Sequence, residues 1–297
     1  MFRKSNPLQS KSEILLRNLT VTGMIIFYVV FLLVPIGIAF AGSFHEWNPL
    51  SGIYRFTGIE NYVNVFTSAL FGKAMLNTLI FSVVVIFFRV GLGLAIAVAI
   101  YSTLVKHKSF FRAVYYMPVV TPMVAVAFVW KFLYNPQIGS INQILGLDIN
   151  WLMNPKTALI AIMVMTIWKD FGYAVVMFMA GLYSLPSDAM EAAKVDGAGR
   201  FRCFATVVMP LTIPGLVATG LFSFITGWNE YLFASTFMKS YENWTLPIGI
   251  ASFQGQYATN WGTLMAGAVL ITIPVVILFL ALQKHLVGGM TAGAVKQ

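Results

Sequence analysis

Charge is scarce in this sequence. Only 10% of its 297 residues are Asp, Glu, Lys or Arg, whereas soluble domains have about 25% charged residues. Hydrophobic residues make up 59% of the chain, and the mean hydropathy is +0.80. A soluble fold of this length could not cover its surface with so few charges, so the composition excludes the soluble classes.

Cysteine and histidine are also rare. The single cysteine, Cys203, excludes an intramolecular disulfide and any Cys-rich metal site. Its charged and aromatic surroundings indicate a surface helix at the cytoplasmic side and an ordinary reduced thiol. The three histidines, His45, His107 and His285, are far apart in sequence, which argues against a metal site or a proton relay built on them.

Motifs for energised or catalytic chemistry are missing as well. The one Gly-Lys pair, Gly72-Lys73, is followed by Ala and lacks the upstream glycine of a phosphate-binding loop. Zincin and nucleophile-elbow patterns are absent too, so an enzyme is not supported. Lys and Arg are scattered over short loops, which favours membrane topology and not a nucleic acid partner.

What the chain does have is a series of long apolar stretches. A spanning helix needs about 20 mostly apolar residues, and the sequence predicts a polytopic all-α membrane protein with six transmembrane helices. The predicted spans are 20–42, 74–102, 113–133, 158–184, 211–235 and 263–286. Residues 1–19 form an N-terminal segment, 20–286 the transmembrane domain and 287–297 a tail. The first span is too long for a signal-peptide core and is expected to be retained.

Prolines lie in or near these spans, and neighbouring helices can satisfy the carbonyls that they free. The residues are Pro35, Pro118, Pro122, Pro214 and Pro274. The stretch Gly91–Ala99, GLGLAIAVA, places small residues along one helix and predicts a close helix–helix contact.

The basic residues give the orientation. The two termini and the two even-numbered loops together hold 12 Lys and Arg residues, and the opposite loops hold 4. The positive-inside rule therefore places both termini and the even-numbered loops in the cytoplasm.

One polar loop, residues 185–210, stands out between the fourth and fifth spans. Five charged residues fall within 191–202. Ser187 or Asp188 is a plausible N-cap, Asp196-Gly197 breaks the first helix, and a second helix over about 199–208 is stopped or kinked by Pro210. The pattern predicts a compact helix–turn–helix projection at the cytoplasmic side.

This loop resembles the EAA motif of the permease subunits of binding-protein-dependent ABC importers. The motif runs E-A-A, three residues, G, nine residues, I, one residue, L-P. Glu191-Ala192-Ala193, Gly197, Val207 and Met209-Pro210 stand at these positions, with Val for Ile and Met for Leu as conservative departures. The resemblance implies a type I ABC importer permease fold whose coupling helix docks in a groove of the ATPase subunit.

The resemblance assigns roles to individual residues. ATPase coupling falls on Glu191, Ala192, Ala193, Asp196, Gly197, Ala198, Arg200, Phe204 and Pro210. ATP and Mg are then bound by the partner ATPase, and this chain holds no cofactor. The tail is similar to one that reaches the ATPase interface, which assigns contacts to Gly289, Thr291, Gly293 and Lys296; a frayed terminus is the alternative.

The likeness covers nearly the whole chain but mixes two subunit types. GIENYVNVF and YYMPVVTPMVAVAFVWKFLYNPQIGSINQIL look like the larger maltose or glycerol-phosphate permease subunit, whereas WNEYLFASTF and TLPIGIASFQGQY look like the G-type subunit. The chain's position in a permease pair, as a heterodimer or a homodimer, therefore stays open. The implied partners are an ABC ATPase dimer, a second permease subunit, an extracytoplasmic sugar-binding protein and membrane lipid, with no nucleic acid.

Charged groups inside spans normally face a cavity or a partner. Lys131 lies near a span end and can snorkel, and Lys169 and Asp170 either offset each other or line a polar path. A candidate substrate path is Trp228, Asn229, Glu230 and Tyr231, because sugars stack on aromatic rings and bind amides and carboxylates. An interfacial aromatic belt explains the same residues equally well.

The sequence thus predicts the membrane-spanning subunit of an ATP-driven carbohydrate importer. It would form half of the translocation path and couple to a separate ATPase through the EAA loop. The alternative is a stand-alone secondary transporter or channel for a small polar solute, which would work without an ATPase. The particular sugar is not encoded in any residue pattern of this chain.

Overall fold

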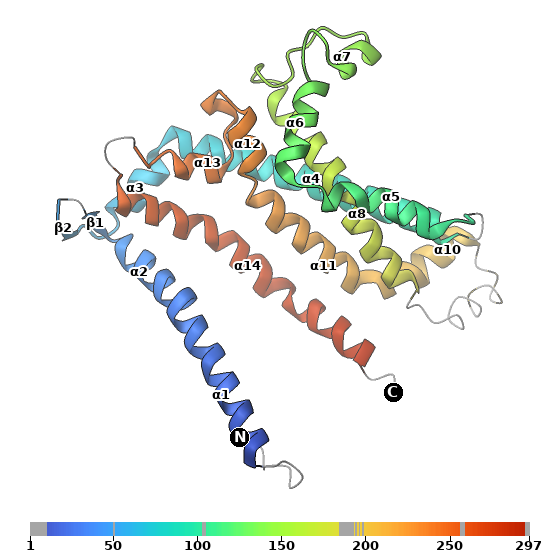
Figure 1. Cartoon of the computed structure of the whole chain (residues 1–297), viewed down its shortest axis with the longest axis horizontal. Helices are drawn as coiled ribbons and strands as arrows, with labels where there is room; N and C mark the ends of the chain where they lie inside the picture. The colour runs from blue at the N-terminus through green and yellow to red at the C-terminus, as the bar shows by residue number, and fades with distance from the viewer. Residues whose placement is uncertain are drawn as a thin grey trace. The chain divides into compact units, whose positions relative to one another are not determined.

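The computed structural model of the chain describes residues 11–49, 51–102, 105–183, 193, 195, 197, 199–255 and 259–294. The chain divides into two compact units, which are described separately. The first comprises Met1–Val65 and Phe253–Leu270, and the second Phe66–Ser252 and Ile271–Gln297. Figure 1 shows that helices dominate both.

The first unit begins with one long apolar helix and a small hairpin. The helix consists of α1 (Lys11–Tyr28), the π-helix η1 (Val29–Leu33) and α2 (Val34–Gly42). Strands β1 (His45–Asn48) and β2 (Ile53–Phe56) then pair antiparallel, with His45 opposite Phe56. An isolated bridge joins Gln254 to Thr259.

The buried side chain of Asn61 in α3 (Glu60–Thr67) joins three parts of the first unit. Its Nδ2 donates to the carbonyl oxygens of Ser43 and His45, at 3.0 Å each. Its Oδ1 accepts from the hydroxyl of Thr263 at 3.3 Å, in the first turns of α14 (Trp261–Ala294). Because buried amides need partners, this one residue fixes the relative positions of the hairpin, α3 and α14 within the unit.

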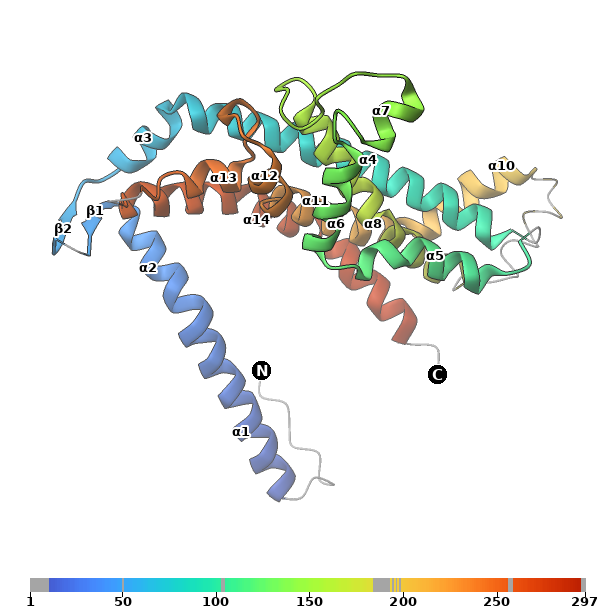
Figure 2. The same cartoon turned by 45° about the horizontal axis from the view of Figure 1, so that its top comes forward.

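The second unit is a helical bundle whose main members lie side by side in both views (Figure 1, Figure 2). Its elements are α4 (Ala69–Tyr101), α5 (Lys108–Val120), α6 (Met123–Leu133), α7 (Ser140–Leu145), α8 (Ala158–Tyr183), α10 (Arg200–Cys203), η2 (Phe204–Val208), α11 (Met209–Trp228), α12 (Leu232–Phe237), η3 (Tyr241–Asn243), α13 (Leu246–Ala251) and the part of α14 from residue 271. Helix α4 packs on α8 and α11, and α5 packs on α8.

Small residues allow the closest of these contacts. A Cβ on Gly93 of α4 would lie 3.2 Å from the backbone carbon of Ala174 in α8, and a Cβ on Gly172 of α8 would lie 2.7 Å from the carbonyl carbon of Tyr115 in α5. The predicted close contact of the small-residue stretch is confirmed at Gly93. Gly91, by contrast, has no atom within 4 Å of its would-be Cβ. Without water inside a membrane, such backbone approach gives the van der Waals contact that holds helices together.

Helix α6 meets α8 at an aromatic and polar contact. The buried hydroxyl of Tyr134 donates to the carbonyl of Ala161 at 2.8 Å. Burial raises the pKa of this phenol, so the hydroxyl keeps its proton and remains a donor. Trp130 packs edge-on to Trp168, with ring centroids 5.6 Å apart.

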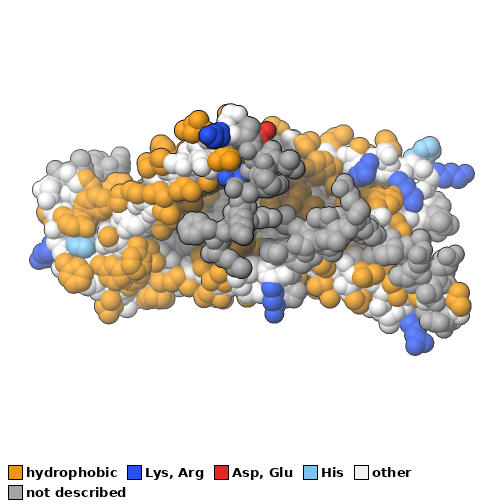
Figure 3. All heavy atoms as spheres, turned by 90° about the horizontal axis from the view of Figure 1, so that it is seen from below, with side chains coloured by type: hydrophobic (Ala, Val, Ile, Leu, Met, Phe, Trp, Pro, Cys, Tyr) orange, Lys and Arg blue, Asp and Glu red, His pale blue; other side chains and the backbone are white. Residues whose placement is uncertain are grey.

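Five helices in the described chain are long and apolar enough to cross a membrane, and a sixth span results if the bent pair α5–α6 is counted as one. The five helices are Lys11–Gly42, Ala69–Tyr101, Ala158–Tyr183, Phe204–Phe237 and Trp261–Lys284. Apolar side chains are accordingly exposed over much of the described surface in Figure 3, with Lys and Arg at scattered points. The all-α polytopic fold class is confirmed. The first helix begins at Lys11, earlier than predicted.

The third predicted span, 113–133, is not a continuous helix. Helices α5 and α6 meet at an angle of 95°, and Figure 2 shows α6 turning away from the direction of α5. Proline clashes with a preceding residue in helical conformation, so Thr121, before Pro122, is extended with ψ 133°. Pro118 is tolerated inside α5, and Pro214 and Pro274 likewise lie within helices, as predicted.

The sequence predicted a stop or a kink at Pro210, and the structure shows no stop. The chain is helical without a break from Arg200 to Trp228, passing through the π-helix η2 just before Pro210. In η2 the N–H of Met209 reaches back to the carbonyl of Phe204, which widens the turn where proline supplies no donor. The same arrangement occurs in the first unit, where η1 precedes Pro35. Cys203, expected on a surface helix, is buried.

Candidate functional site

The polar loop predicted to couple the chain to a partner is only partly described. Glu191, Ala192, Asp196 and Ala198 lie outside the described residues. Ala193 is helical, and α10 begins at Arg200, which places Phe204 at the start of η2 and Pro210 in the first turn of α11. The described loop residues therefore lead directly into the spanning helix α11.

Gly197 marks the turn in this loop. Its φ is +75°, in the left-handed region that disfavours residues with a side chain, and its would-be Cβ has no atom within 4 Å. The backbone conformation, and not crowding, therefore requires glycine here. The predicted helix break is confirmed at Gly197 by this conformation. Gly199 has the same open surroundings but no positive φ.

The four residues of the candidate substrate path divide into two kinds. Trp228 is 1% exposed; its indole N–H donates to the carbonyl of Ile271 at 3.0 Å and its ring stacks on Phe224. Glu230 is 4% exposed, and its Oε1 accepts from the N–H of Phe233 at 2.7 Å. Asn229 and Tyr231 are exposed. Only these last two side chains are accessible to a solute in this state of the chain.

Glu230 joins two short elements, α12 and the start of α13. Besides capping the start of α12 with its side chain, it accepts the hydroxyl of Thr245 at its own carbonyl, at 2.8 Å. The N–H of Leu246, the first residue of α13, donates to the hydroxyl of Thr78 in α4 at 2.7 Å. Nearby, the side chain of Asn77 donates to two carbonyls, those of Glu242 and Trp244. Sequence reasoning missed Asn77 and Thr78, although two adjacent polar residues in an apolar span are a signal.

The residues of the predicted tail contact lie in the last helix. Gly289, Thr291 and Gly293 belong to α14, which continues to Ala294, and Lys296 lies outside the described residues. The contact role itself stays a prediction.

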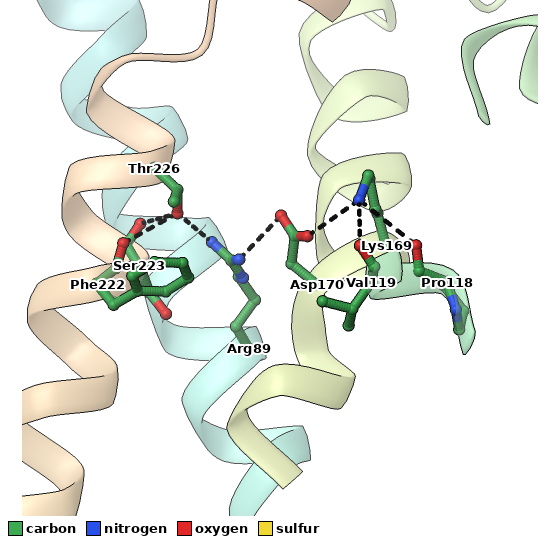
Figure 4. A network of polar contacts seen from close by, with 8 residues as sticks. All are labelled: Arg89, Pro118, Val119, Lys169, Asp170, Phe222, Ser223 and Thr226. Atoms are coloured by element: carbon green, nitrogen blue, oxygen red, sulfur yellow. Dashed lines mark hydrogen bonds and ion pairs between the residues drawn. The ribbon is translucent and has the colours of Figure 1, made fainter. Parts of the chain in front are cut away.

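A polar network in the middle of the bundle joins three charged residues that lie inside spans, Arg89, Lys169 and Asp170 (Figure 4). Asp170 of α8 pairs with Arg89 of α4, Nη2 to Oδ2 at 2.9 Å. The other guanidinium nitrogen, Nη1, donates to the hydroxyl of Thr226 in α11 at 2.6 Å. Arg89 is 1% exposed, whereas the Asp170 side chain is 19% exposed. A buried guanidinium without its carboxylate would be very costly, so the pair is matched as charges must be in a membrane.

Lys169 extends the network to the bend of the third span. Its Nζ donates to the carbonyls of Val119 and Pro118, at 3.1 and 3.4 Å, and lies 3.6 Å from Oδ1 of Asp170. These carbonyls belong to the last turn of α5, which ends at Val120. The ammonium therefore occupies the negative end of a helix dipole; it supplies the donor of the Val119 carbonyl and adds a second donor to Pro118, which also accepts from the N–H of Thr121. The sequence left two readings of Lys169 and Asp170 open, mutual compensation or a polar path, and it did not indicate Arg89 or the α5 carbonyls as their partners.

Comparison with known protein families shows to which family of proteins the chain belongs. Residues 89–292 match the family described as binding-protein-dependent transport system inner membrane component. The chain belongs to this family. The matched residues of the permease include the polar network, the loop around Gly197 and the tail up to residue 292.

Named relatives of the permease are uptake-system components. It is 29% identical over 277 residues to the diacetylchitobiose uptake system permease protein NgcF of Streptomyces coelicolor, covering 84% of this chain and 78% of that one. It is 32% identical to the multiple sugar-binding transport system permease protein MsmF of Streptococcus mutans, covering 65% and 67%. It is 46% identical to the trehalose/maltose transport system permease protein MalG of Thermococcus litoralis, over 38% and 41%.

Solved structures share the fold of the permease. A chain of a bacterial ABC transporter involved in the import of the acidic polysaccharide alginate superposes with a TM-score of 0.76 at 22% identity, covering 91% of this chain and 94% of that one. A chain of the MetNI methionine ABC transporter in an inward-facing conformation gives 0.54 at 18% identity, covering 74% and 96%. The permease is thus a multi-pass membrane protein with the fold of ABC importer transmembrane subunits.

Proposed function

We propose that this chain is the membrane-spanning subunit of an ATP-driven carbohydrate importer. The observation that carries the proposal is the family match over residues 89–292, together with relatives named for diacetylchitobiose, multiple-sugar and trehalose/maltose transport. ATP hydrolysis belongs to a separate chain, since the sequence has no phosphate-binding loop. The chain forms half of the path and a second permease subunit, identical or different, forms the other half.

Coupling to the ATPase dimer is assigned to the loop around Gly197. Its support is mechanical: the loop enters a helix that runs unbroken from Arg200 to Trp228. A displacement of the loop would therefore reach the middle of the membrane without a hinge in the described helix. The tail residues Gly289, Thr291, Gly293 and Lys296 are assigned a second contact with the same ATPase. ATP and Mg would be bound there and not by this chain.

The orientation follows from the basic residues. With 12 Lys and Arg on the side of the termini and 4 on the other, both termini and the coupling loop face the cytoplasm across the inner membrane of a prokaryote. An extracytoplasmic sugar-binding protein then delivers substrate to the opposite side. On that side Asn229 and Tyr231, both exposed, are the proposed sugar contacts from the predicted path.

Two neighbouring glycines provide a test of the coupling role. Gly197→Val forces a β-branched residue into a left-handed conformation, at a cost of about 1–2 kcal/mol or more, while Gly199→Val has no such strain. In proteoliposomes that contain the complete transporter, we expect Gly197→Val to lower sugar uptake and stimulated ATP hydrolysis roughly tenfold. Gly199→Val should remain near wild type, and Gly197→Asn should restore much of the loss, because Asn tolerates this conformation.

The outcome also separates the alternatives. An ATPase that co-purifies with the tagged chain, and uptake that requires ATP, would support the importer. Gradient-driven uptake by the purified chain alone would instead identify a secondary transporter or channel. Equal uptake by the Gly197→Val and Gly199→Val variants would show that the loop does not couple.

A further inference from the structure

We infer that Lys169 is a positioning residue that holds the bend of the third span, and that Asp170, Arg89 and Thr226 connect this bend to α11. The inference rests on the proposed function only where it concerns transport. Its structural part stands on the contacts drawn in Figure 4, which link four helices of the second unit.

The bend needs an external partner to be stable inside a membrane. At the break, the chain leaves the helical conformation at Thr121, so the last carbonyls of α5 lose the donors four residues ahead that a continuing helix would supply. In lipid each unsatisfied backbone group costs several kcal/mol, because no water replaces the partner. The carbonyl of Val119 accepts from Lys169 at 3.1 Å. The carbonyl of Pro118 accepts from the N–H of Thr121 at 3.2 Å, and Lys169 adds a second donor at 3.4 Å. A bend of 95° in this span is therefore stabilised by a side chain of another helix.

The Lys169 ammonium is itself held by charge. Asp170, the next residue of α8, lies 3.6 Å away through Oδ1 and accepts the Arg89 guanidinium through Oδ2 at 2.9 Å. One carboxylate thus serves the cation from its own helix and the cation from α4. Loss of the carboxylate would leave two buried cations without a compensating charge. The ion pair between Asp170 and Arg89 therefore links the position of α8 to that of α4.

Thr226 connects the network to α11. Its hydroxyl accepts from Arg89 at 2.6 Å and lies 3.0 and 3.1 Å from the carbonyls of Phe222 and Ser223, so it is oriented by its own helix. From Arg200 to Thr226 the helix extends about 39 Å at 1.5 Å per residue. A shift of the loop end of this helix is therefore transmitted through Arg89 and Asp170 to the bend. Arg89 Nε, which finds no partner among the described residues, leaves one donor for a second acceptor when the helices move.

Spin-label distances across the bend test the structural part. Labels at Ser109 of α5 and Phe132 of α6, both exposed, are introduced after Cys203→Ser removes the single cysteine. With 1.5 Å per residue and a 95° bend, their backbones lie about 23 Å apart, against about 35 Å for a straight helix. The complete transporter is measured in lipid nanodiscs by electron–electron double resonance. This measurement needs neither sugar nor ATP, so it remains valid if the transport proposal fails.

We expect the wild-type distribution to centre near the short distance and Lys169→Met to broaden it toward the long one. Lys169→Arg, which keeps the donors and the charge, should restore the short distance. Lys131→Met serves as the matched control, because this exposed lysine lies on α6 of the same bent span. A Lys169→Met distribution that superposes on the wild type would overturn the inference, as would an equal broadening by Lys131→Met.

The connection to α11 has its own readout. Lys169→Met should lower ATP-driven uptake at least about tenfold, the change given by one lost charge-assisted hydrogen bond, and Lys169→Arg should stay within about twofold. Thr226→Val should also lower uptake, and the double variant Lys169→Met/Thr226→Val should be no worse than Lys169→Met alone, because both changes interrupt one connection. Multiplicative losses in the double variant would show that Thr226 acts independently and would refute the connection.

Discussion

The contact between α5 and α8 gives the sharpest structural prediction, through Gly172→Ala. A Cβ at position 172 would lie 2.7 Å from the carbonyl carbon of Tyr115 on α5 and 3.2 Å from the Cα of Tyr116, the next residue. Both are backbone atoms. Ordinary contact begins at about 3.4 Å, so the helices must separate by at least about 0.7 Å. A side-chain rotation cannot relieve the clash, because the obstacle is main chain.

The consequences follow from the position of Gly172 one turn beyond Lys169 on α8. Separation would lengthen the 3.1 Å bond from Lys169 to the carbonyl of Val119 beyond hydrogen-bond range. Overpacking of a tight interior typically costs about 1–3 kcal/mol, and the weakened ammonium–carbonyl bond adds to it. We therefore expect a lower midpoint of thermal unfolding in detergent, followed by the monodisperse fraction after heating.

The matched control for this change lies in the same helix. Gly181→Ala makes the same substitution in α8, where the nearest atom to the new Cβ is Cγ2 of Thr212 at 4.0 Å. It should be neutral or slightly stabilising, because alanine favours a helix over glycine by about 1 kcal/mol. A Gly172→Ala variant that is as stable as Gly181→Ala would refute the reasoning, since the close approach of α5 and α8 would then be absent.

Two further predictions concern the stretch around Trp228. Trp228→Phe keeps the ring but removes the donor to Ile271 and should cost about 1 kcal/mol, while Trp228→Ala should cost about 3–5 kcal/mol; unchanged stability with a raised KM for sugar uptake would instead favour direct sugar contact. Glu230→Ala leaves the N–H of Phe233 without its acceptor and should cost about 1–3 kcal/mol, whereas Glu230→Gln retains an acceptor oxygen and should cost less. Equal unfolding midpoints for the two Glu230 variants would contradict the capping role.

Proline shows how far the sequence could predict the path of the spans. Pro118 and Pro122 are four residues apart, and both could be tolerated by neighbouring helices. The outcome differs: α5 continues through Pro118, and the chain bends at Pro122. A proline inside a span frees carbonyls, and whether a bend persists there depends on a donor from elsewhere. Here the donor is Lys169, 50 residues from Val119 in sequence.

Aromatic and acidic residues show a second limit. Trp228 and Glu230 have the chemistry of a sugar site, and an interfacial belt explained them equally well. Their side chains instead engage backbone groups of Ile271 and Phe233 within the chain. The same donor or acceptor serves a ligand or the protein's own backbone, and residue type alone does not distinguish these uses. The exposure of each side chain does distinguish them, and only Asn229 and Tyr231 of the four predicted path residues are exposed to a solute.

The sequence alone determined that this protein lies in a membrane, because a chain with 10% charged and 59% hydrophobic residues cannot cover a soluble surface. It also located the turn at Gly197, since a backbone requirement for glycine is local. Only the tertiary structure decided which groups the buried charges bind. Arg89 donates to Thr226, 137 residues away in sequence, and Lys169 donates to the end of a helix that exists only because the third span bends. Hydropathy is a property of each segment by itself, whereas the partner of a buried charge is fixed by how the segments pack.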